Sequence, residues 1–230
     1  MKTTVQYVAR FVANPRTLVE FVKKNHVRMR NTHATSLTPG YVRLVESANT
    51  PVVIRRKGML WGTSDKNRNV AYSLDIHTAP PAGPADYLTA YWCGYQAGSV
   101  RSIVLTNAYD FVFTALVNGC TIGLGHQANN ARLMTHANAQ NAGGMDTAQM
   151  SAFTITEMVN NNAQIDTVLQ YDGYRHSKAA RLANDGNDGS INALIFGIRV
   201  GQDQWEFYYE RHNQMGVGAH RVQYGVKSIE

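Results

Sequence analysis

Two residues that could carry nucleophilic chemistry lie near the middle of this chain of 230 residues. Cys120 follows an Asn-Gly pair, and His136 lies in the next apolar segment, beyond a loop rich in Gly and Asn. A cysteine is a strong nucleophile only as the thiolate, and a neighbouring imidazole is a common base that removes its proton. The pair could therefore attack a carbonyl carbon if folding brings the two side chains together.

The segments on either side of that loop are typical of a β-hairpin. Residues 120–124 and 131–136 are short apolar runs, and the residues between them favour a turn. If the hairpin closes symmetrically about Ala128, Cys120 lies directly opposite His136 on one face, with Cβ atoms about 4.5–5.5 Å apart. A one-residue slip would turn the histidine to the other face. The expected register predicts a Cys–His hydrogen bond of about 3–3.5 Å.

The segment before the cysteine is expected to form a helix. Residues 106–110 supply a capping side chain followed by an acid, and residues 111–116 are apolar at helical spacing. Asn118 and Gly119 would then end the helix. Cys120 would lie at a helix-to-strand junction, where the backbone N–H groups of Gly119 and Cys120 could stabilise an oxyanion.

This arrangement resembles the Cys-His glutamine deamidase toxins, the group of the cytotoxic necrotizing factor catalytic domain and Burkholderia lethal factor. The group shares a Leu-Ser-Gly-Cys segment with a histidine later in the chain; here the segment reads Val-Asn-Gly-Cys at 117–120, with His136 after it. In the lethal factor a threonine lies six positions before the cysteine, and Thr114 has that offset here. A looser match covers residues 87–103. Asn118 replaces the motif's serine, and the loop between cysteine and histidine is longer.

The resemblance implies an enzyme of the toxin or effector class that deamidates a glutamine of a host protein. Cys120 would attack the carboxamide carbon, His136 would move the protons, and Thr114 would orient the imidazole. Capture of the same thioester by a primary amine would make the enzyme a transglutaminase. The expected fold is mixed α/β: a largely antiparallel β-sandwich flanked by helices, similar to the cytotoxic necrotizing factor catalytic domain. One catalytic domain would span residues 1–230.

Partners and location follow partly from composition and partly from the resemblance. The resemblance implies a Rho-type GTPase or a translation-initiation helicase as target, and no cofactor. No apolar run approaches the ~20 residues of a membrane helix, and residues 1–24 lack a signal-peptide pattern. We therefore expect a monomer that does not bind membranes and that is secreted or injected without a classical signal peptide, to act in the host cytoplasm.

A non-catalytic basic binding protein is the alternative from a different functional class. The net charge of +6 and the pI near 9.4 favour acidic partners, either nucleic acid or an acidic protein. The basic residues are dispersed, however, and cluster only at 23–28 and 53–57. No nucleic-acid-binding signature accompanies them, so binding to nucleic acid is not expected.

Several other polar residues admit a functional interpretation. Cys93 is interpreted as a buried strand residue, although a disulfide with Cys120 stays open. His126 is the second choice for the base, because it falls within the loop of the hairpin. Closed metal sites need about four ligands at defined spacing. The pairs Asp172 with His176 and Glu210 with His212 do not provide that, and residues 184–190 are interpreted as a turn rather than a calcium loop.

The remaining elements are predicted from periodicity. A helical pattern covers residues 5–30, with Asn14-Pro15 as a helix start, and residues 152–171 fit either a helix or a strand. Loops are expected at 78–86 and 137–151, flanking a partly exposed site. The expected strands, with turns at 47–50 and 63–69 and a final hairpin, are 41–46, 51–60, 70–77, 191–200 and 205–211.

Overall fold

The computed structural model describes residues 3–31, 33–57, 63–117, 119–141, 144–170, 191–214 and 221–229. This part of the chain is mixed α/β and mostly β, as predicted. The helices are α1 (Thr4–Ala13), α2 (Arg16–Lys24) and α3 (Thr147–Asn160). The strands are β1 (His26–Asn31), β2 (Leu37–Lys57), β3 (Thr63–His77), β4 (Tyr87–Cys93), β5 (Ser99–Leu105), β6 (Phe111–Thr114), β7 (Thr121–Gln127), β8 (Arg132–Asn138), β9 (Gln140–Asn141), β10 (Gly144–Met145), β11 (Ala163–Leu169), β12 (Ile191–Gly201), β13 (Gln204–Gln214) and β14 (Arg221–Ile229).

The strands form two main sheets. The larger has eight strands in the order β1-β3-β2-β14-β13-β12-β6-β4, and the smaller has four in the order β11-β7-β8-β5. Most neighbours are antiparallel, and β1–β3, β14–β2 and β4–β6 are parallel. Strand β2 pairs with β4 along 37–43 and with β14 along 52–54. The larger sheet therefore curls back on itself.

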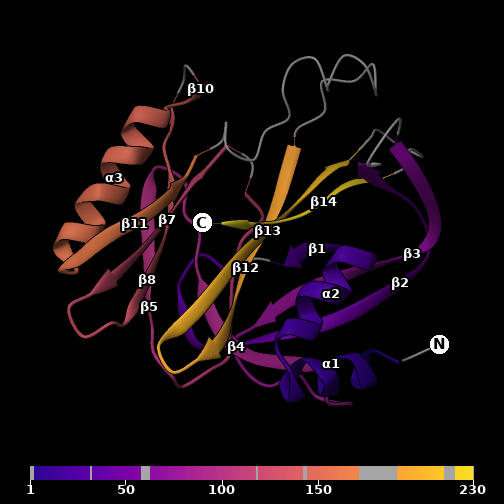
Figure 1. Ribbon diagram of the computed structural model, residues 1–230. Helices are drawn as coiled ribbons and strands as arrows, with labels where there is room; N and C mark the ends of the chain where they lie inside the picture. The colour runs from indigo at the N-terminus through magenta and orange to yellow at the C-terminus, as the bar shows by residue number, and fades with distance from the viewer. Residues whose placement is uncertain are drawn as a thin grey trace.

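The layers follow the order helix, sheet, sheet, helix, and apolar cores lie between them (Figure 1). Helices α1 and α2 pack on one face of the larger sheet, where Phe11 and Leu18 join a core with Phe113. The other face of that sheet packs against the smaller sheet, and Ile195 meets Ile122 in this second core. Helix α3 covers the outer face of the smaller sheet, as Figure 1 shows at the left. The arrangement is compatible with the expected sandwich flanked by helices.

The prediction of a helix before Cys120 is wrong, because residues 111–114 form strand β6. All four residues of β6 are buried: Phe111 and Phe113 face the helix-side core, and Val112 faces the smaller sheet. A short apolar run buried on both faces has no alternation that would distinguish it from helix. Beyond β6, Val117 exchanges backbone hydrogen bonds with Ala193 of β12.

The N-terminal half also departs from the prediction at the element ends. The helical pattern of 5–30 is two helices and a strand, with the break at Asn14-Pro15, where α2 begins as predicted. The turn expected at 47–50 is a register irregularity inside β2, and the one at 63–69 lies within β3. The β2–β3 connection falls in 58–62, outside the described residues.

The C-terminal half confirms some predictions and resolves others. The hairpin expected from 191–200 and 205–211 is formed by β12 and β13. The ambiguous segment 152–171 is the end of α3 followed by β11. The expected loop 137–151 is wrong, because it contains the end of β8, the β9–β10 ladder and the start of α3. None of the described helices is both long and apolar enough to cross a membrane.

Candidate active site

The candidate site lies between the two sheets, where strand alternation turns polar side chains inward. On β6, Thr114 shares the face of Val112, which packs toward the smaller sheet. On β8, His136 and Asn138 share the face of Met134, which packs toward the larger sheet. The structure therefore brings Thr114 and His136 together from different sheets, as the prediction of a Thr–His contact requires.

The β7–β8 hairpin exists as predicted, but its register is shifted by two residues. Ile122 pairs with His136, so the turn is centred on Asn129 instead of Ala128. Asn130 adopts φ 64°, and the Asn129 side chain accepts a hydrogen bond from the backbone N–H of Ala131. Because a two-residue shift preserves the alternation, the face that carries His136 still includes position 120.

The shifted register places Asn138, instead of His136, next to the cysteine. The Nδ2 group of Asn138 donates a hydrogen bond of 3.3 Å to the Sγ of Cys120. Cys120 and His136 are therefore diagonal neighbours, and diagonal pairs lie farther apart than directly opposed ones. Nε2 of His136 makes no hydrogen bond to any described residue, so the expected Cys–His hydrogen bond is absent from its contacts.

Thr114 fixes the tautomer of His136. The threonine hydroxyl donates to the carbonyl oxygen of Cys93 at 2.9 Å and lies 2.6 Å from Nδ1 of His136. A carbonyl oxygen only accepts, so the hydroxyl proton is directed to Cys93 and Oγ1 must accept from an Nδ1–H. The lone pair of the ring then resides on Nε2. His136 is held in the form that can take a proton from a thiol.

Burial keeps this histidine neutral. His136 is 1% exposed, and desolvation lowers the pKa of its imidazole to about 3. Nε2 therefore carries no proton at neutral pH. The arrangement therefore suits a general base that accepts the thiol proton during attack, and it does not suit a resting thiolate–imidazolium pair.

Two further residues complete the cluster and were missed in the sequence. Nδ2 of Asn138 also donates to the hydroxyl of Tyr95 at 3.2 Å, and the Tyr95 ring lies 5.3 Å from that of His136. Burial, together with the nearby Cys120, raises the pKa of the Tyr95 phenol. Strand alternation places position 138 on the same face as His136, so this pattern could have indicated Asn138 as a member of the site. No local pattern distinguishes Tyr95 from its aromatic neighbours.

The backbone before Cys120 is irregular, as the oxyanion-hole hypothesis requires. Gly119 has φ 91°, a left-handed conformation that glycine adopts at little cost. This residue lets the chain turn from the loop after β6 into β7. Asn118, which replaces the serine of the toxin motif, lies outside the described residues.

Cys93 has the structural role that was predicted for it. It is a fully buried residue of β4, and its Sγ lies 3.8 Å from the carbonyl oxygens of Arg101 and Met134. Burial raises the pKa of its thiol. The two cysteines are not joined by a disulfide.

The expected exposure of the site is wrong. Cys120 is 2% exposed and Thr114 is fully buried, because the cluster lies within the core between the sheets. The loop 78–86 does not flank the site: it enters β4 at Tyr87, six residues before Cys93, or about 20 Å along the strand. Tyr95 is the half-buried member of the cluster and lies nearest to solvent.

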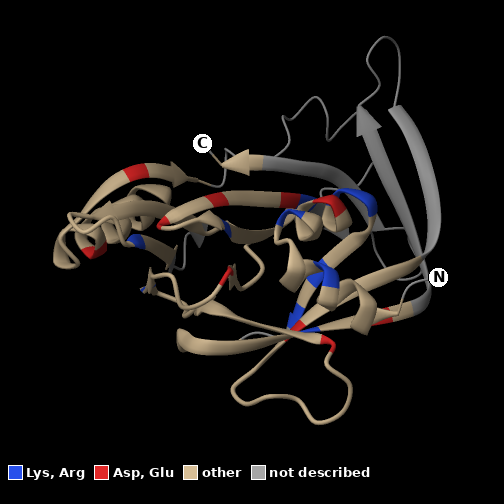
Figure 2. Cartoon of the chain, turned by 60° about the horizontal axis from the view of Figure 1, so that its bottom comes forward, with Lys and Arg blue, Asp and Glu red and all other residues tan. Residues whose placement is uncertain are grey.

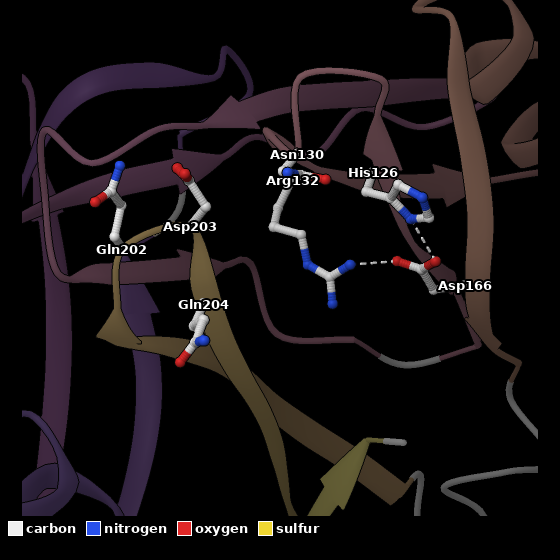
Figure 3. Close-up of a pocket in the computed structure, with 7 residues that line it drawn as sticks. All are labelled: His126, Asn130, Arg132, Asp166, Gln202, Asp203 and Gln204. Carbon is white, nitrogen blue, oxygen red and sulfur yellow. Dashed lines mark hydrogen bonds and ion pairs between the residues drawn. The ribbon is translucent and has the colours of Figure 1, made fainter.

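A second histidine lines an open polar cavity at the far end of the same hairpin (Figure 3). The cavity measures about 700 Å³. Nδ1 of His126 lies 2.7 Å from Asp166, which also binds Arg132 at 2.5 Å. Figure 3 shows Asn130 on this side and the β12–β13 turn, residues 202–204, facing it. His126 is six residues beyond Cys120, about 20 Å along β7, so it cannot serve as the base for that cysteine.

The other site hypotheses find little support among the described residues. No group of three or more His, Cys, Asp or Glu side chains there could hold a metal ion. Glu210 is buried on β13, 3.6 Å from Nδ1 of His26, and burial raises its pKa well above the ordinary value. The His212 side chain and the segments with Asp172 and 184–190 lie outside what the structure describes.

Charged residues are interspersed over the described elements. Figure 2 shows Lys and Arg segments in blue and Asp and Glu segments in red on several of the described elements. Several arginines are paired with acids, as in Arg16–Glu206, Arg43–Asp86 and Arg199–Asp110. These pairs give no specific support to the basic binding-protein alternative among the described side chains, and those of the basic cluster 53–57 lie outside them.

No protein-family model matches the chain, and no curated protein matches it either.

Proposed function

We propose that this protein is a protein-glutamine deamidase of the Cys-His toxin type, with Cys120 as nucleophile, His136 as base and Thr114 as the residue that orients the imidazole. One observation carries the proposal: the 2.6 Å contact between Thr114 and His136, with the Thr114 proton committed to Cys93, fixes a neutral Nδ1–H imidazole. Its vacant Nε2 lies on the face that also holds Cys120. That is the protonation state a base needs for thiol attack.

The first half-reaction forms a thioester. Sγ of Cys120 bonds to the carboxamide carbon of the target glutamine, and the thiol proton moves to Nε2 of His136. The carbonyl oxygen becomes an oxyanion, which the backbone N–H groups at Gly119 and Cys120 are proposed to stabilise. The imidazolium then returns the proton to the departing nitrogen, the C–N bond breaks, and ammonia leaves.

The second half-reaction releases the product. Water attacks the thioester carbon while Nε2 of His136 takes one of its protons, and the C–S bond breaks as the thiolate of Cys120 is reprotonated. The target glutamine has become glutamate. If a primary amine replaces the water, an amide forms instead, which is the transglutaminase variant of the same chemistry.

Burial of the cluster has a consequence for the reaction. Because Cys120 and His136 are 2% and 1% exposed, a target side chain reaches them only after neighbouring groups move. Tyr95 is the half-buried residue over the site, and its hydroxyl contacts Asn138. We propose that displacement of this ring admits the substrate.

The resemblance supplies the proposed context of the reaction. It favours a host protein as substrate, either a Rho-type GTPase or a translation-initiation helicase, with the enzyme secreted or injected without a classical signal peptide and active as a monomer in the host cytoplasm. The helix–sheet–sheet–helix layers are compatible with the cytotoxic necrotizing factor catalytic-domain fold, which we propose as the family of this chain.

The direct test is peptide mass spectrometry of both candidate targets after incubation with the wild type. We expect one glutamine to become glutamate with the wild type and to stay unchanged with Cys120→Ser. Cys93→Ser is the matched control and should keep the activity. Deamidation that persists with Cys120→Ser would remove this cysteine from the mechanism. Adding a primary amine distinguishes the transglutaminase variant, because the amine would then be found on the same glutamine.

A further inference from the structure

Asn138 holds a buried polar atom that makes no hydrogen bond in the described part of the chain. The residue is 2% exposed, and its Oδ1 makes no hydrogen bond to any described residue. Its Nδ2 group, in contrast, is fully used by Tyr95 at 3.2 Å and Cys120 at 3.3 Å. Buried acceptors in folded proteins are nearly always paired, so an unpaired one requires an explanation. The atom lies beside the proposed nucleophile, which suggests that its partner is the substrate.

The contacts of Asn138 fix its orientation. Its position on β8 sets the backbone, and the Tyr95 hydroxyl accepts one of the two N–H groups. The other N–H points to Sγ of Cys120, where the reacting carbon must arrive. The backbone of β8 holds this carboxamide beside Cys120 also when the Tyr95 ring moves, and such positioning is what recognition and oxyanion stabilisation require.

We propose that Asn138 recognises the primary carboxamide of the substrate, an inference that rests on the proposed function. Oδ1 would accept an N–H of the substrate amide, while the N–H now directed at Sγ would turn to the substrate oxygen as it becomes an oxyanion. A primary carboxamide has a donor and an acceptor side by side, and the Asn138 carboxamide is its complement. The glutamate product has no N–H for Oδ1, so it is held less well and leaves.

The substrate class follows from this pairing. An ester or a tertiary amide lacks the N–H that Oδ1 needs and would leave that acceptor buried and unpaired. Sites built to hydrogen-bond a substrate group discriminate strongly against analogues that lack it. Asn138 would therefore select carboxamides that carry an N–H, whatever the identity of the target protein.

The test uses small electrophiles, so it needs no knowledge of the target. In a Cys93→Ala protein Cys120 is the sole thiol. Its alkylation is followed by intact mass with 2-chloroacetamide and with N,N-dimethyl-2-chloroacetamide, which lacks N–H groups. Each rate is divided by that of glutathione to remove intrinsic reactivity. We expect the protein to favour the primary amide by about tenfold and Asn138→Leu to remove the preference. Asn25→Leu, at a buried asparagine capping α2, should keep it.

The outcomes separate this inference from the proposed function. If Asn138→Leu keeps the tenfold preference, or if the parent has none while Cys120 still reacts, the inference is wrong and the deamidase proposal stands. If neither reagent alkylates Cys120 in the folded protein, both fail. Asn138→Val replaces the leucine variant if the latter does not fold, as judged by circular dichroism.

Discussion

The two histidines of the β7–β8 hairpin have the same kind of hydrogen bond and opposite surroundings. In His136, Nδ1 lies 2.6 Å from the Thr114 hydroxyl; in His126, it lies 2.7 Å from the Asp166 carboxylate. Both contacts fix an Nδ1–H tautomer, since the carboxylate only accepts and the hydroxyl proton is committed elsewhere. The first ring is 1% exposed, whereas about a third of the second side chain is exposed.

The difference shows which property each contact controls. The partner of Nδ1 decides which nitrogen has the lone pair, and burial decides the protonation of the ring. The neutral Thr114 offers no charge to offset desolvation, so the pKa of His136 falls to about 3. His126 has a carboxylate and Arg132 at its side, in an open polar cavity with no nucleophile among its lining residues. Only the buried histidine shares its surroundings with a cysteine.

The largest expected effect comes from replacing His136 by asparagine, with the same replacement of His126 as the comparison. His136→Asn removes the proposed base, so alkylation of Cys120 by chloroacetamide at pH 7 should slow by about 100-fold or more. His126→Asn should leave the rate within a factor of about 2. Intact-mass kinetics in a Cys93→Ala background measure both. Equal losses in the two variants would show that the effect is not specific to the buried ring.

Stability should respond to acid through His136. The pKa is about 3 in the folded protein and about 6.5 in the unfolded chain. Between these values the unfolded chain binds a proton that the folded protein does not, so stability falls as pH falls. From pH 6.5 to pH 5 this group should reduce the free energy of unfolding by about 2 kcal/mol.

Urea unfolding at pH 6.5 and pH 5 measures that change. The loss on acidification should be smaller in His136→Asn than in the wild type by about 2 kcal/mol. An identical loss in His136→Asn and the wild type would mean that the buried ring is protonated in the folded state.

A third comparison changes the hydrogen-bond partner of Nδ1 in each of the two histidines. Thr114→Val leaves the Nδ1–H of His136 without an acceptor and favours the tautomer that places the proton on Nε2. Alkylation of Cys120 should slow by about tenfold, and Thr114→Ser should restore most of the rate. Asp166→Asn disturbs the partner of His126 and should not change the rate. A Thr114→Val protein as fast as the wild type would remove Thr114 from the mechanism.

Removing the ring of Tyr95 should have the smallest effect and the opposite sign. Tyr95→Ala opens the buried cluster, so a bulky maleimide should alkylate Cys120 several-fold faster. Tyr95→Phe keeps the ring over His136 and should react at nearly the wild-type rate. A rate unchanged in Tyr95→Ala would place the entrance elsewhere.

The sequence predicted one contact of the candidate site and missed the register of the hairpin that carries it. Thr114 contacts His136 as expected, and the strand alternation puts His136 and the position of Cys120 on one face. The register was wrong because the turn depends on Asn130 in a left-handed conformation, which its neighbours do not dictate. That two-residue difference brought Asn138, unnoticed in the sequence, to the cysteine.

Two features could not be predicted from the local sequence pattern: the burial of Cys120 and the strand conformation of β6. The apolar run 111–114 fits a helix as well as a strand, and only packing between two cores decides for the strand. The exposure of Cys120 depends on two sheets that meet face to face, with strands far apart in the chain. Sequence periodicity describes one element at a time. It therefore predicts which residues share a face of a strand, but it does not predict how deeply that face is buried.

The most direct test of the central claim is the pH dependence of Cys120 alkylation in the folded Cys93→Ala protein. An isolated thiol reacts as the thiolate, so its rate falls about tenfold per pH unit below ~8.5. If neutral His136 removes the proton, the rate should stay nearly constant from about pH 8 to about pH 5, because this ring is not protonated until far lower pH. His136→Asn should restore the tenfold dependence. A tenfold loss per pH unit in the protein that retains His136 would contradict the account.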